Sequence, residues 1–215
     1  MTFIRPLYTC GAFNRHAQRA VMYNTARGTC YTFDDVSALL IKEVLAGERE
    51  SPINTAHIAW VTGTEEEQVE EFCCQQLLPI GLVHDHVWSD DEWLQYRKDF
   101  PPCIINNGSE PAADYWAAVP QEQRISLNFE LTYACSERCL HCFNEGAARS
   151  DLHEEHRLRP DMLTMDDYKR IIDEAVDLGI PEVTVTGGDP FSYPHCWDIL
   201  DYMHKCNLAV KLVTN

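Results

Sequence analysis

"ELTYACSERCLHCFNEG", residues 130–146, places three of the chain's ten cysteines within eight positions. These are Cys135, Cys139 and Cys142, and they come directly after "ISLNFELTY", an alternating run that predicts a β-strand. In parallel α/β folds, active sites lie at the edge where the strands end. Three thiolates at this spacing can converge on one inorganic centre, so the stretch predicts a metal or cluster site at a strand end.

The residues after the cysteines alternate between helix and strand patterns. "TMDDYKRIIDEAVDLGI" predicts a helix that Thr164 caps and Gly179 ends, and "PEVTVTGGDP" predicts a strand that runs into a glycine turn. "PHCWDILDYMHKCN" predicts a second helix and "LAVKLVTN" a third strand. This order predicts an α/β fold with parallel strands and right-handed helical crossovers.

The cysteines themselves allow three interpretations. A structural zinc ion requires four ligands, and His141 could supply the fourth, although the chain lacks two well-separated CxxC pairs. An iron–sulfur cubane held by three cysteines leaves one iron open to a small molecule. The third interpretation is three unliganded thiols.

"CSERCLHC" has the CxxxCxΦC spacing of the radical S-adenosylmethionine (radical SAM) superfamily, in which Φ is usually aromatic and is His141 here. "TGGDP" resembles that superfamily's GGE-type turn, and "LVTN" resembles one of its common strand endings. The resemblance covers residues 125–215 and implies the N-terminal half of a partial (βα)6 TIM-like barrel. "RCLHCFNEG" is most similar to the branch of peptide and protein maturases that carry a C-terminal SPASM domain.

The resemblance also implies roles for individual residues. Cys135, Cys139 and Cys142 would hold a [4Fe–4S] cluster, and His141 would lie near the adenine of SAM. The turn Gly187–Gly188–Asp189 would receive the SAM amino group, with Asp189 in place of the commoner glutamate. The cluster would cleave SAM to a 5′-deoxyadenosyl radical, which would abstract a hydrogen atom from a ribosomally made peptide or protein. By itself, the glycine pair would be read as an ordinary strand-to-helix turn.

Residues 1–88 predict a small winged-helix-like α+β domain. "RAVMYNTARGTCYTF" predicts a hairpin, and helices are expected from Asp34 or Asp35 to Gly47, over residues 54–61, and from a Thr64–Glu67 capping box to Pro79. The pattern resembles the PqqD-like peptide-recognition domain, which adds a leader-peptide strand to a sheet edge. A generic winged-helix domain is the alternative.

Residues 89–124 predict a linker, because proline, glycine, asparagine and acidic residues occur there without a sustained period. One helical turn is expected near Trp93, and Cys103 is expected to be a plain thiol.

The net charge of −17 argues against nucleic acid as a partner, because phosphate binding requires dense Lys and Arg. No apolar run approaches the ~20 residues of a membrane span, and the N-terminus lacks a signal-peptide pattern, so we expect a cytoplasmic protein with reduced cysteines. The expected partners are a leader peptide and an electron donor such as a flavodoxin or ferredoxin.

The sequence ends at Asn215 on the third strand, so we expect the chain to be incomplete as a radical SAM core and inactive by itself. Two other functions remain open at this point. One is a non-catalytic module that captures a peptide, and the other is a zinc-stabilised structural protein that uses the three cysteines and His141.

Overall fold

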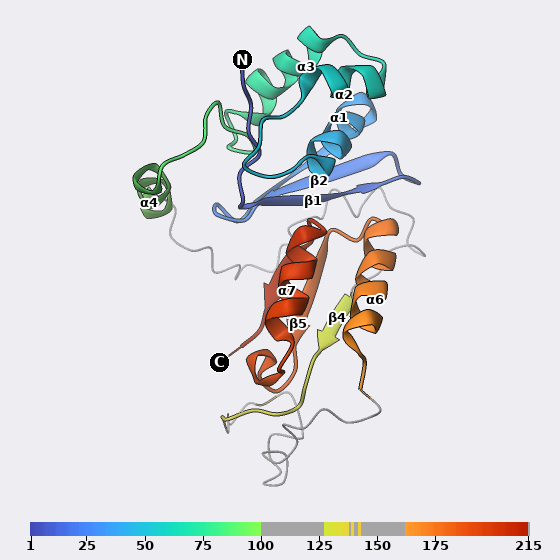
Figure 1. Cartoon of the computed structure of the whole chain (residues 1–215), viewed down its shortest axis with the longest axis vertical. Helices are drawn as coiled ribbons and strands as arrows, with labels where there is room; N and C mark the ends of the chain where they lie inside the picture. The colour runs from blue at the N-terminus through green and yellow to red at the C-terminus, as the bar shows by residue number, and fades with distance from the viewer. Residues whose placement is uncertain (100–126, 138, 140–141, 143–161, 215) are drawn as a thin grey trace. The chain divides into compact units, whose positions relative to one another are not determined.

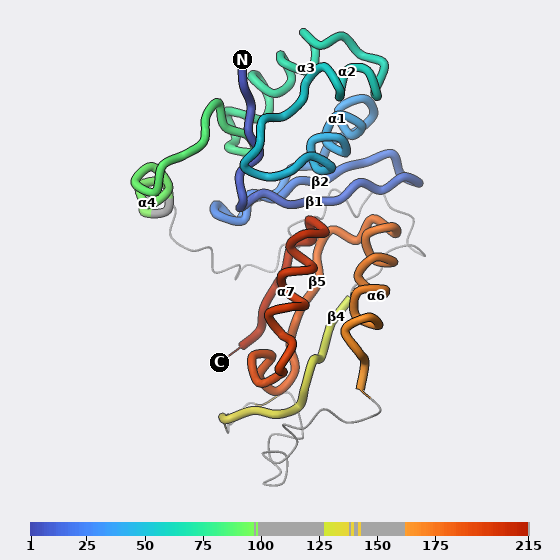
Figure 2. The backbone as a smooth tube through the Cα atoms, viewed as in Figure 1, coloured from blue at the N-terminus to red at the C-terminus, as the bar shows by residue number. Residues whose placement is uncertain are grey.

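The structure, a computed structural model, describes residues 1–99, 127–137, 139, 142 and 162–214. The chain divides into two compact units, Met1–Arg124 and Ile125–Asn215. Figure 1 shows the elements of each unit, and Figure 2 follows the same backbone as a tube. The predicted linker beyond residue 99 and Cys103 lie outside the described residues.

The sheet of the first unit is an antiparallel meander in the order β1-β2-β3. The predicted hairpin is confirmed as the pair β2 and β3, but a third strand, β1, precedes it (β1 Thr9–Asn14, β2 Arg19–Asn24, β3 Thr29–Asp34). The sequence did not predict β1, because "TCGAFN" contains a glycine and has few β-branched residues.

Helices cover one face of this sheet and form its core (Figure 1). These helices are α1 Asp35–Ala46, α2 Thr55–Thr62, α3 Glu66–Phe72 and the π-helix η1 Cys73–Leu77, whereas α4 Asp90–Asp99 lies to one side of them. Met22 of β2, Ile41 of α1 and Leu77 of η1 are fully buried in one cluster. Burial of this apolar surface stabilises the unit.

Two helix starts differ in detail from the sequence prediction. Asp34 is the N-cap of α1, yet its side chain makes no capping hydrogen bond and instead pairs with Arg19, 2.5 Å away. The predicted capping box of Thr64 and Glu67 is wrong by one residue, because Glu65 and Gln68 form it. The Glu65 N–H donates to the side chain of Gln68 over 3.0 Å.

Helix α4 is longer than the single turn expected near Trp93. It belongs to the first unit, where Trp93 and Tyr96 stack on Tyr8 with ring centroids 5.3 Å and 5.4 Å apart. The buried Asn24 side chain also donates to the hydroxyl of Tyr96 over 3.0 Å. This helix was missed because its core contacts are aromatic rings at positions that do not give an amphipathic aliphatic pattern.

The second unit confirms the predicted alternation of strands and helices. Its sheet is parallel, in the order β4-β5-β6 (β4 Leu127–Glu130, α6 Met165–Asp177, β5 Glu182–Thr186, η5 Pro190–Ser192, α7 Cys196–Lys205, β6 Ala209–Leu212). Val185 of β5, Ile172 of α6 and Ile199 of α7 are fully buried in one core. Among the described helices of both units, none has the length and apolarity to cross a membrane.

Candidate functional site

Strands β4 and β5 bring two loops to one edge of the second sheet. They pair in parallel from Leu127 opposite Val183 to Glu130 opposite Thr186. The pairing continues one residue further, because the Leu131 N–H donates to the Thr186 carbonyl over 3.1 Å. The chain that leads to the cysteines and the glycine turn after β5 therefore leave the sheet side by side.

The glycine turn is hydrogen-bonded to the chain that precedes Cys135. The Gly188 N–H donates to the Thr132 carbonyl over 2.6 Å, and the Asp189 N–H donates to the Ala134 carbonyl over 2.8 Å. Both acceptors lie within three residues of Cys135. The turn thus fixes the backbone from which Cys135, the first of the three cysteines, emerges.

The two glycines are required by this close backbone contact. Gly187 has a φ of +139°, a conformation that residues with a Cβ rarely adopt. A Cβ on Gly187 would lie 2.2 Å from the Thr132 carbonyl oxygen, and one on Gly188 would lie 2.4 Å from that of Ala134. The strand-to-helix turn therefore also serves as the platform for the cysteine loop.

Asp189 connects the same turn to two further segments. Its Oδ1 accepts from the N–H of Phe191 over 3.4 Å, which caps the short helix η5. The same atom accepts from the hydroxyl of Thr214, just after β6, over 2.8 Å. The carboxylate thereby ties the end of β6 to the glycine turn.

The three cysteines differ in exposure. Cys135 is 9% exposed, and the N–H of Glu137 donates to its sulfur over 3.4 Å. Cys139 and Cys142 are exposed, and the Cys142 N–H donates to the Cys139 carbonyl over 3.2 Å. The described residues, which include all three thiols, contain no group of three or more His, Cys, Asp or Glu side chains arranged to hold a metal ion. The structure thus hydrogen-bonds the glycine turn to the start of the cysteine loop, but it does not bring the three thiols together at one point. His141 lies outside the described residues.

The donor chemistry and the backbone fit an iron–sulfur cluster. Thiolate sulfurs are the usual protein ligands of such clusters, and a backbone N–H that points at a ligating sulfur, as that of Glu137 points at Cys135, is one of the groups that tune them.

Other cysteines are packing residues. Cys73 is fully buried in the core of the first unit, and burial raises the pKa of its thiol to about 12. Cys196 is buried in the core of the second unit, and burial, together with the nearby Asp189, raises its pKa as well. Thiols of this kind stay protonated at neutral pH and are poor metal ligands.

Comparison with known proteins identifies the segment that carries this site. The model of the radical SAM superfamily matches residues 129–215, a range that contains the three cysteines and the glycine turn. This segment is similar to the radical SAM superfamily, and the match covers less than half of the chain. Members of that superfamily use a [4Fe–4S] cluster and SAM.

The curated proteins that are similar to part of this chain include the following two. Mycofactocin maturase MftC of Mycobacterium tuberculosis is 34% identical over 91 residues, which are 42% of this chain and 21% of that protein. The antilisterial bacteriocin subtilosin biosynthesis protein AlbA of Bacillus subtilis is 30% identical over 91 residues, 42% of this chain and 18% of that protein. The chain therefore matches only about a fifth of the length of either relative.

Among solved structures, Streptococcus suis SuiB bound to its precursor peptide SuiA aligns with a TM-score of 0.45 at 15% identity. The alignment covers 100% of this chain and 43% of that chain.

Sequence reasoning found the cysteines and the turn but missed Thr132, Ala134 and Thr214. The Thr132 and Ala134 carbonyls act through the backbone, so the side-chain pattern carries no signal for them. Thr214 belongs to the "LVTN" strand ending, which was noted without a role for its hydroxyl.

Proposed function

We propose that the second unit is the beginning of a radical SAM catalytic core, within the N-terminal half of a partial (βα)6 barrel. In this proposal, Cys135, Cys139 and Cys142 bind the [4Fe–4S] cluster. When bound, the cluster and SAM supply a 5′-deoxyadenosyl radical that abstracts hydrogen from a substrate. The observation that carries the proposal is the pair of hydrogen bonds from the Gly188 and Asp189 N–H groups to the loop before Cys135.

The chain's own residues would position the two cofactors relative to each other. The N–H groups of Gly188 and Asp189 are engaged by Thr132 and Ala134, so the turn would present carbonyl oxygens to the ammonium group of SAM. Asp189 would hold that turn rigid through Phe191 and Thr214 rather than contact the ligand. His141, in the cysteine loop, would lie near the adenine.

We further propose that the substrate is a ribosomally made peptide and that the first unit recognises its leader. MftC is by name a mycofactocin maturase and AlbA is by name an antilisterial bacteriocin subtilosin biosynthesis protein, and each is similar to 42% of this chain. In the first unit, β3 is an edge strand of its sheet. A groove of ≈ 490 Å³ lies between β3 at Tyr31–Phe33 and the residues Gln76 and Ile80.

An edge strand beside a groove suits β-augmentation. Backbone hydrogen bonds to the edge would give affinity, and side chains in the groove would give specificity. This is the way in which a PqqD-like domain, made of residues 1–88 together with α4, would serve the catalytic core. A SPASM domain, a flavodoxin or ferredoxin as electron donor, and a reducing cytosolic location belong to the same proposal.

Anaerobic reconstitution with iron and sulfide tests the cluster assignment. The expected product is brown, with an absorbance band near ~400 nm and about four irons per chain. Cys135→Ala, Cys139→Ala and Cys142→Ala should each lose most of the iron. Cys74→Ala is the matched control, because Cys74 is exposed but lies in the first unit, and it should keep the wild-type iron content.

Two results would overturn the assignment. The first is a colourless protein that holds one zinc ion, which would favour the structural zinc site. The second is iron loss in Cys74→Ala equal to that in the other variants, which would indicate nonspecific binding.

A further inference from the structure

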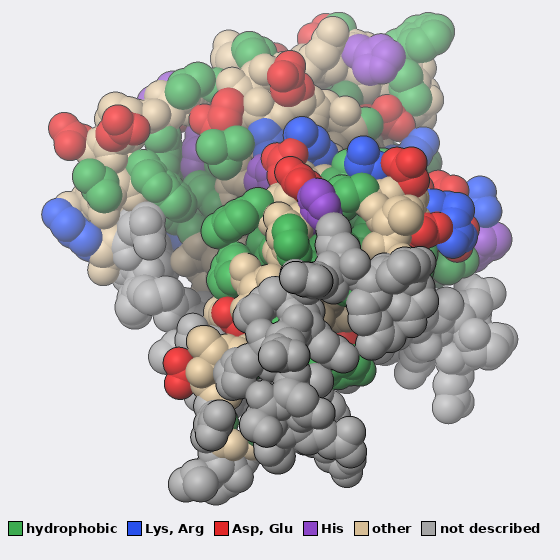
Figure 3. Space-filling model, turned by 60° about the horizontal axis from the view of Figure 1, so that its bottom comes forward, with side chains coloured by type: hydrophobic (Ala, Val, Ile, Leu, Met, Phe, Trp, Pro, Cys, Tyr) green, Lys and Arg blue, Asp and Glu red, His purple; other side chains and the backbone are tan. Residues whose placement is uncertain are grey.

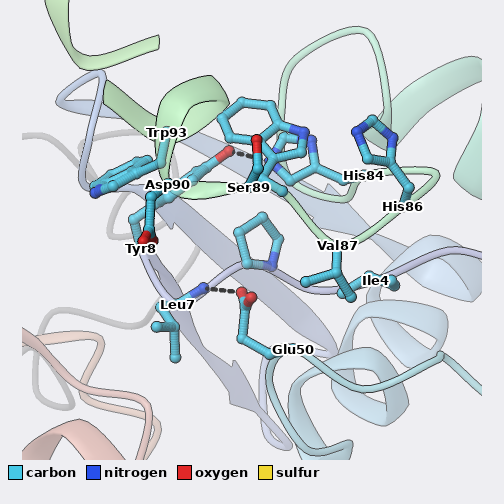
Figure 4. A pocket seen from close by; sticks show the side chains of 12 residues that line it. Ile4, Leu7, Tyr8, Glu50, His84, His86, Val87, Ser89, Asp90 and Trp93 are labelled. Atoms are coloured by element: carbon cyan, nitrogen blue, oxygen red, sulfur yellow. Dashed lines mark hydrogen bonds between the residues drawn. The ribbon is translucent and has the colours of Figure 1, made fainter. Parts of the chain in front are cut away.

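A pocket of ≈ 330 Å³ lies in the first unit, and its lining residues are distinct from those of the groove beside β3. Three segments line it: residues 4–8 before β1, Glu50 after α1, and residues 84–93 that lead into α4. Figure 4 shows the side chains that enclose it. A volume of this size holds one long side chain or a small ligand.

Aromatic rings form one wall of the pocket. Tyr8 stacks on Trp93 with centroids 5.3 Å apart, and Trp88 stacks on the buried His84 at 3.7 Å. The same ring cluster already holds a cation elsewhere, because the Arg27 guanidinium lies over the Tyr96 ring, 5.0 Å from its centroid. Such rings attract cations through their quadrupole.

Aliphatic side chains form the other wall. Ile4, Leu7 and Val87 line the pocket, and Leu7 and Val87 are more than half exposed, at 58% and 55%. Exposed apolar side chains beside a pocket can cover the methylene stem of a long ligand side chain.

Two carboxylates, those of Glu50 and Asp90, complete the lining. Glu50 is held from both ends: its N–H donates to the Arg5 carbonyl over 2.9 Å, and its Oε1 accepts from the Leu7 N–H over 3.0 Å (Figure 4). It keeps this position with a φ of +58°, a left-handed conformation that is unfavourable for glutamate. In Figure 3, hydrophobic side chains at the left of the view, over α4, lie beside acidic and basic ones.

Of the two histidines that line the pocket, only His86 is favoured in its charged form, because hydrogen bonds to Glu92 and Asp85 raise its pKa. Burial, the largest effect, lowers the pKa of His84 to about 4, and its Nε2 pairs with the Tyr8 hydroxyl at 2.5 Å, so the ring is neutral at pH 7. His86 is exposed and pairs with Glu92 at 3.0 Å and with Asp85 at 2.7 Å. The two carboxylates outnumber His86 in the lining, and the nearby Arg27 is not a lining residue, so the lining keeps an excess of negative charge.

We propose that this pocket binds one basic side chain, Arg or Lys, of a peptide that reaches the first unit. The methylene stem lies along Ile4, Leu7 and Val87, and the charged head lies between the aromatic wall and the carboxylates of Glu50 and Asp90. Hydrogen bonds from a guanidinium or ammonium to carboxylates are stronger than neutral ones. The chain's net charge of −17 favours the approach of such a peptide. The site does not depend on the radical chemistry or on the β3 edge.

The test is an NMR titration of the full 215-residue chain with three capped pentapeptides, Ac-Gly-Gly-X-Gly-Gly-NH2. X is arginine, citrulline or norleucine, so the second peptide keeps the shape of arginine without its charge and the third keeps only an apolar stem. The indole N–H signals of Trp88 and Trp93 report on the pocket, and those of Trp60 and Trp197 serve as internal controls. The arginine peptide should shift only the pocket signals and bind about tenfold more tightly than the citrulline peptide.

Substitutions at Glu50 and Asp90 test whether these two carboxylates bind the charged head of the peptide side chain. Glu50→Gln keeps the acceptor for the Leu7 N–H, and Asp90→Asn keeps the side-chain shape, so both should fold. Each should weaken arginine-peptide binding on the order of fivefold while leaving norleucine-peptide binding unchanged. Asp91→Asn is the matched control, because it removes the same charge from the neighbouring position, which does not line the pocket, and it should bind as wild type.

Three results would overturn the proposal. One is equal binding of the arginine, citrulline and norleucine peptides, which would make this a purely apolar pocket. Another is the absence of any shift at Trp88 and Trp93. The third is equal weakening by Asp91→Asn and Asp90→Asn, which would reduce the effect to general charge attraction.

Discussion

At the scale of single residues, Gly188 shows how closely the glycine turn and the cysteine loop are joined. A Cβ at this position would lie 2.4 Å from the Ala134 oxygen and 2.5 Å from the Tyr133 oxygen. Both neighbours are backbone atoms, which cannot move aside as a flexible side chain could. We therefore expect Gly188→Ala to destabilise the second unit by about 1–3 kcal/mol, the usual cost of overpacking.

Urea unfolding of the apo chain measures this cost, and iron content after reconstitution shows its effect on the cysteine loop. Gly47→Ala is the control, because its φ is −70° and the nearest atom to its new Cβ would be 3.4 Å away. If Gly188→Ala unfolded at the same urea concentration as wild type and loaded the same iron, the backbone contact would not be important.

His84 gives a pH dependence to the first unit. Its pKa is lowered to about 4, mainly by burial, from a usual value of about 6.5. Above pH 6.5 both the folded and the unfolded chain hold a neutral ring, so this residue has no effect. Between pH 6.5 and 4 only the unfolded chain gains the proton, so stability falls, by at most about 3 kcal/mol for a shift of this size.

Urea midpoints of the first unit at pH 7 and pH 4.5, followed by tryptophan fluorescence, measure this effect. His84→Phe should remove much of the fall. The exposed His86 acts in the opposite direction, because hydrogen bonds to Glu92 and Asp85 raise its pKa. An equal or larger fall in His84→Phe would assign the pH effect to other groups.

At the scale of elements, the first turn of α6 is capped by exposed hydrogen bonds between Thr164 and Asp167. The Thr164 hydroxyl accepts from the Asp167 N–H over 3.2 Å and donates to the Asp167 carboxylate over 2.7 Å. Thr164→Ala removes the hydroxyl that accepts from the Asp167 N–H, and it should therefore lower the free energy of unfolding of the second unit by about 1 kcal/mol. Thr164→Ser keeps the hydroxyl and should stay close to wild type in chemical denaturation. Equal stability of the two variants would mean that the cap contributes nothing.

Helix α4 is held in place by aromatic contacts and one hydrogen bond, because its sequence has no amphipathic aliphatic pattern. Trp93 and Tyr96 stack on Tyr8, and Tyr96 accepts a hydrogen bond from Asn24. Tyr96→Ala should therefore destabilise the first unit by about 2 kcal/mol, about one for ring packing and one for the hydrogen bond. Leu94→Ala, at a half-exposed position of the same helix, should change the urea midpoint little. Comparable losses in both variants would point to helix propensity instead.

The elements also show what the sequence could predict. Helices α6 and α7 and strand β5 were predicted because their apolar residues recur at helical or strand spacing, and the caps Thr164 and Gly179 mark the ends of α6. Strand β1 was missed because its sequence holds a glycine and few β-branched residues, although it pairs with the adjacent β2. Helix α4 was missed because its contacts depend on a partner distant in sequence, Tyr8 with Trp93. The pocket of the first unit was missed for the same reason. "VHDHVWSDDEW" was assigned to a domain edge and linker, although it holds His84, Trp88 and Trp93.

At the scale of the whole molecule, the dominant feature is charge. The chain carries 34 acidic and 17 basic residues, and self-repulsion of this excess opposes the compact state. Raising NaCl from 0.01 M to 1 M shortens the Debye length from about 30 Å to about 3 Å, so repulsion between surface carboxylates is screened. We therefore expect the free energy of unfolding to rise with salt, by on the order of 1 kcal/mol over this range.

Thermal unfolding in a salt series measures this rise, and Glu67→Lys identifies its origin. Glu67 lies in the acidic first turn of α3, and the substitution changes the net charge from −17 to −15. The variant should start from a higher stability at low salt and gain less from added NaCl, because less repulsion remains to be screened. A stability that falls with salt would mean that attractive pairs such as Arg19 with Asp34 outweigh the excess of acidic residues. The same series bears on the aromatic pocket, since the attraction that draws a basic peptide to it must weaken as the surface charge is screened.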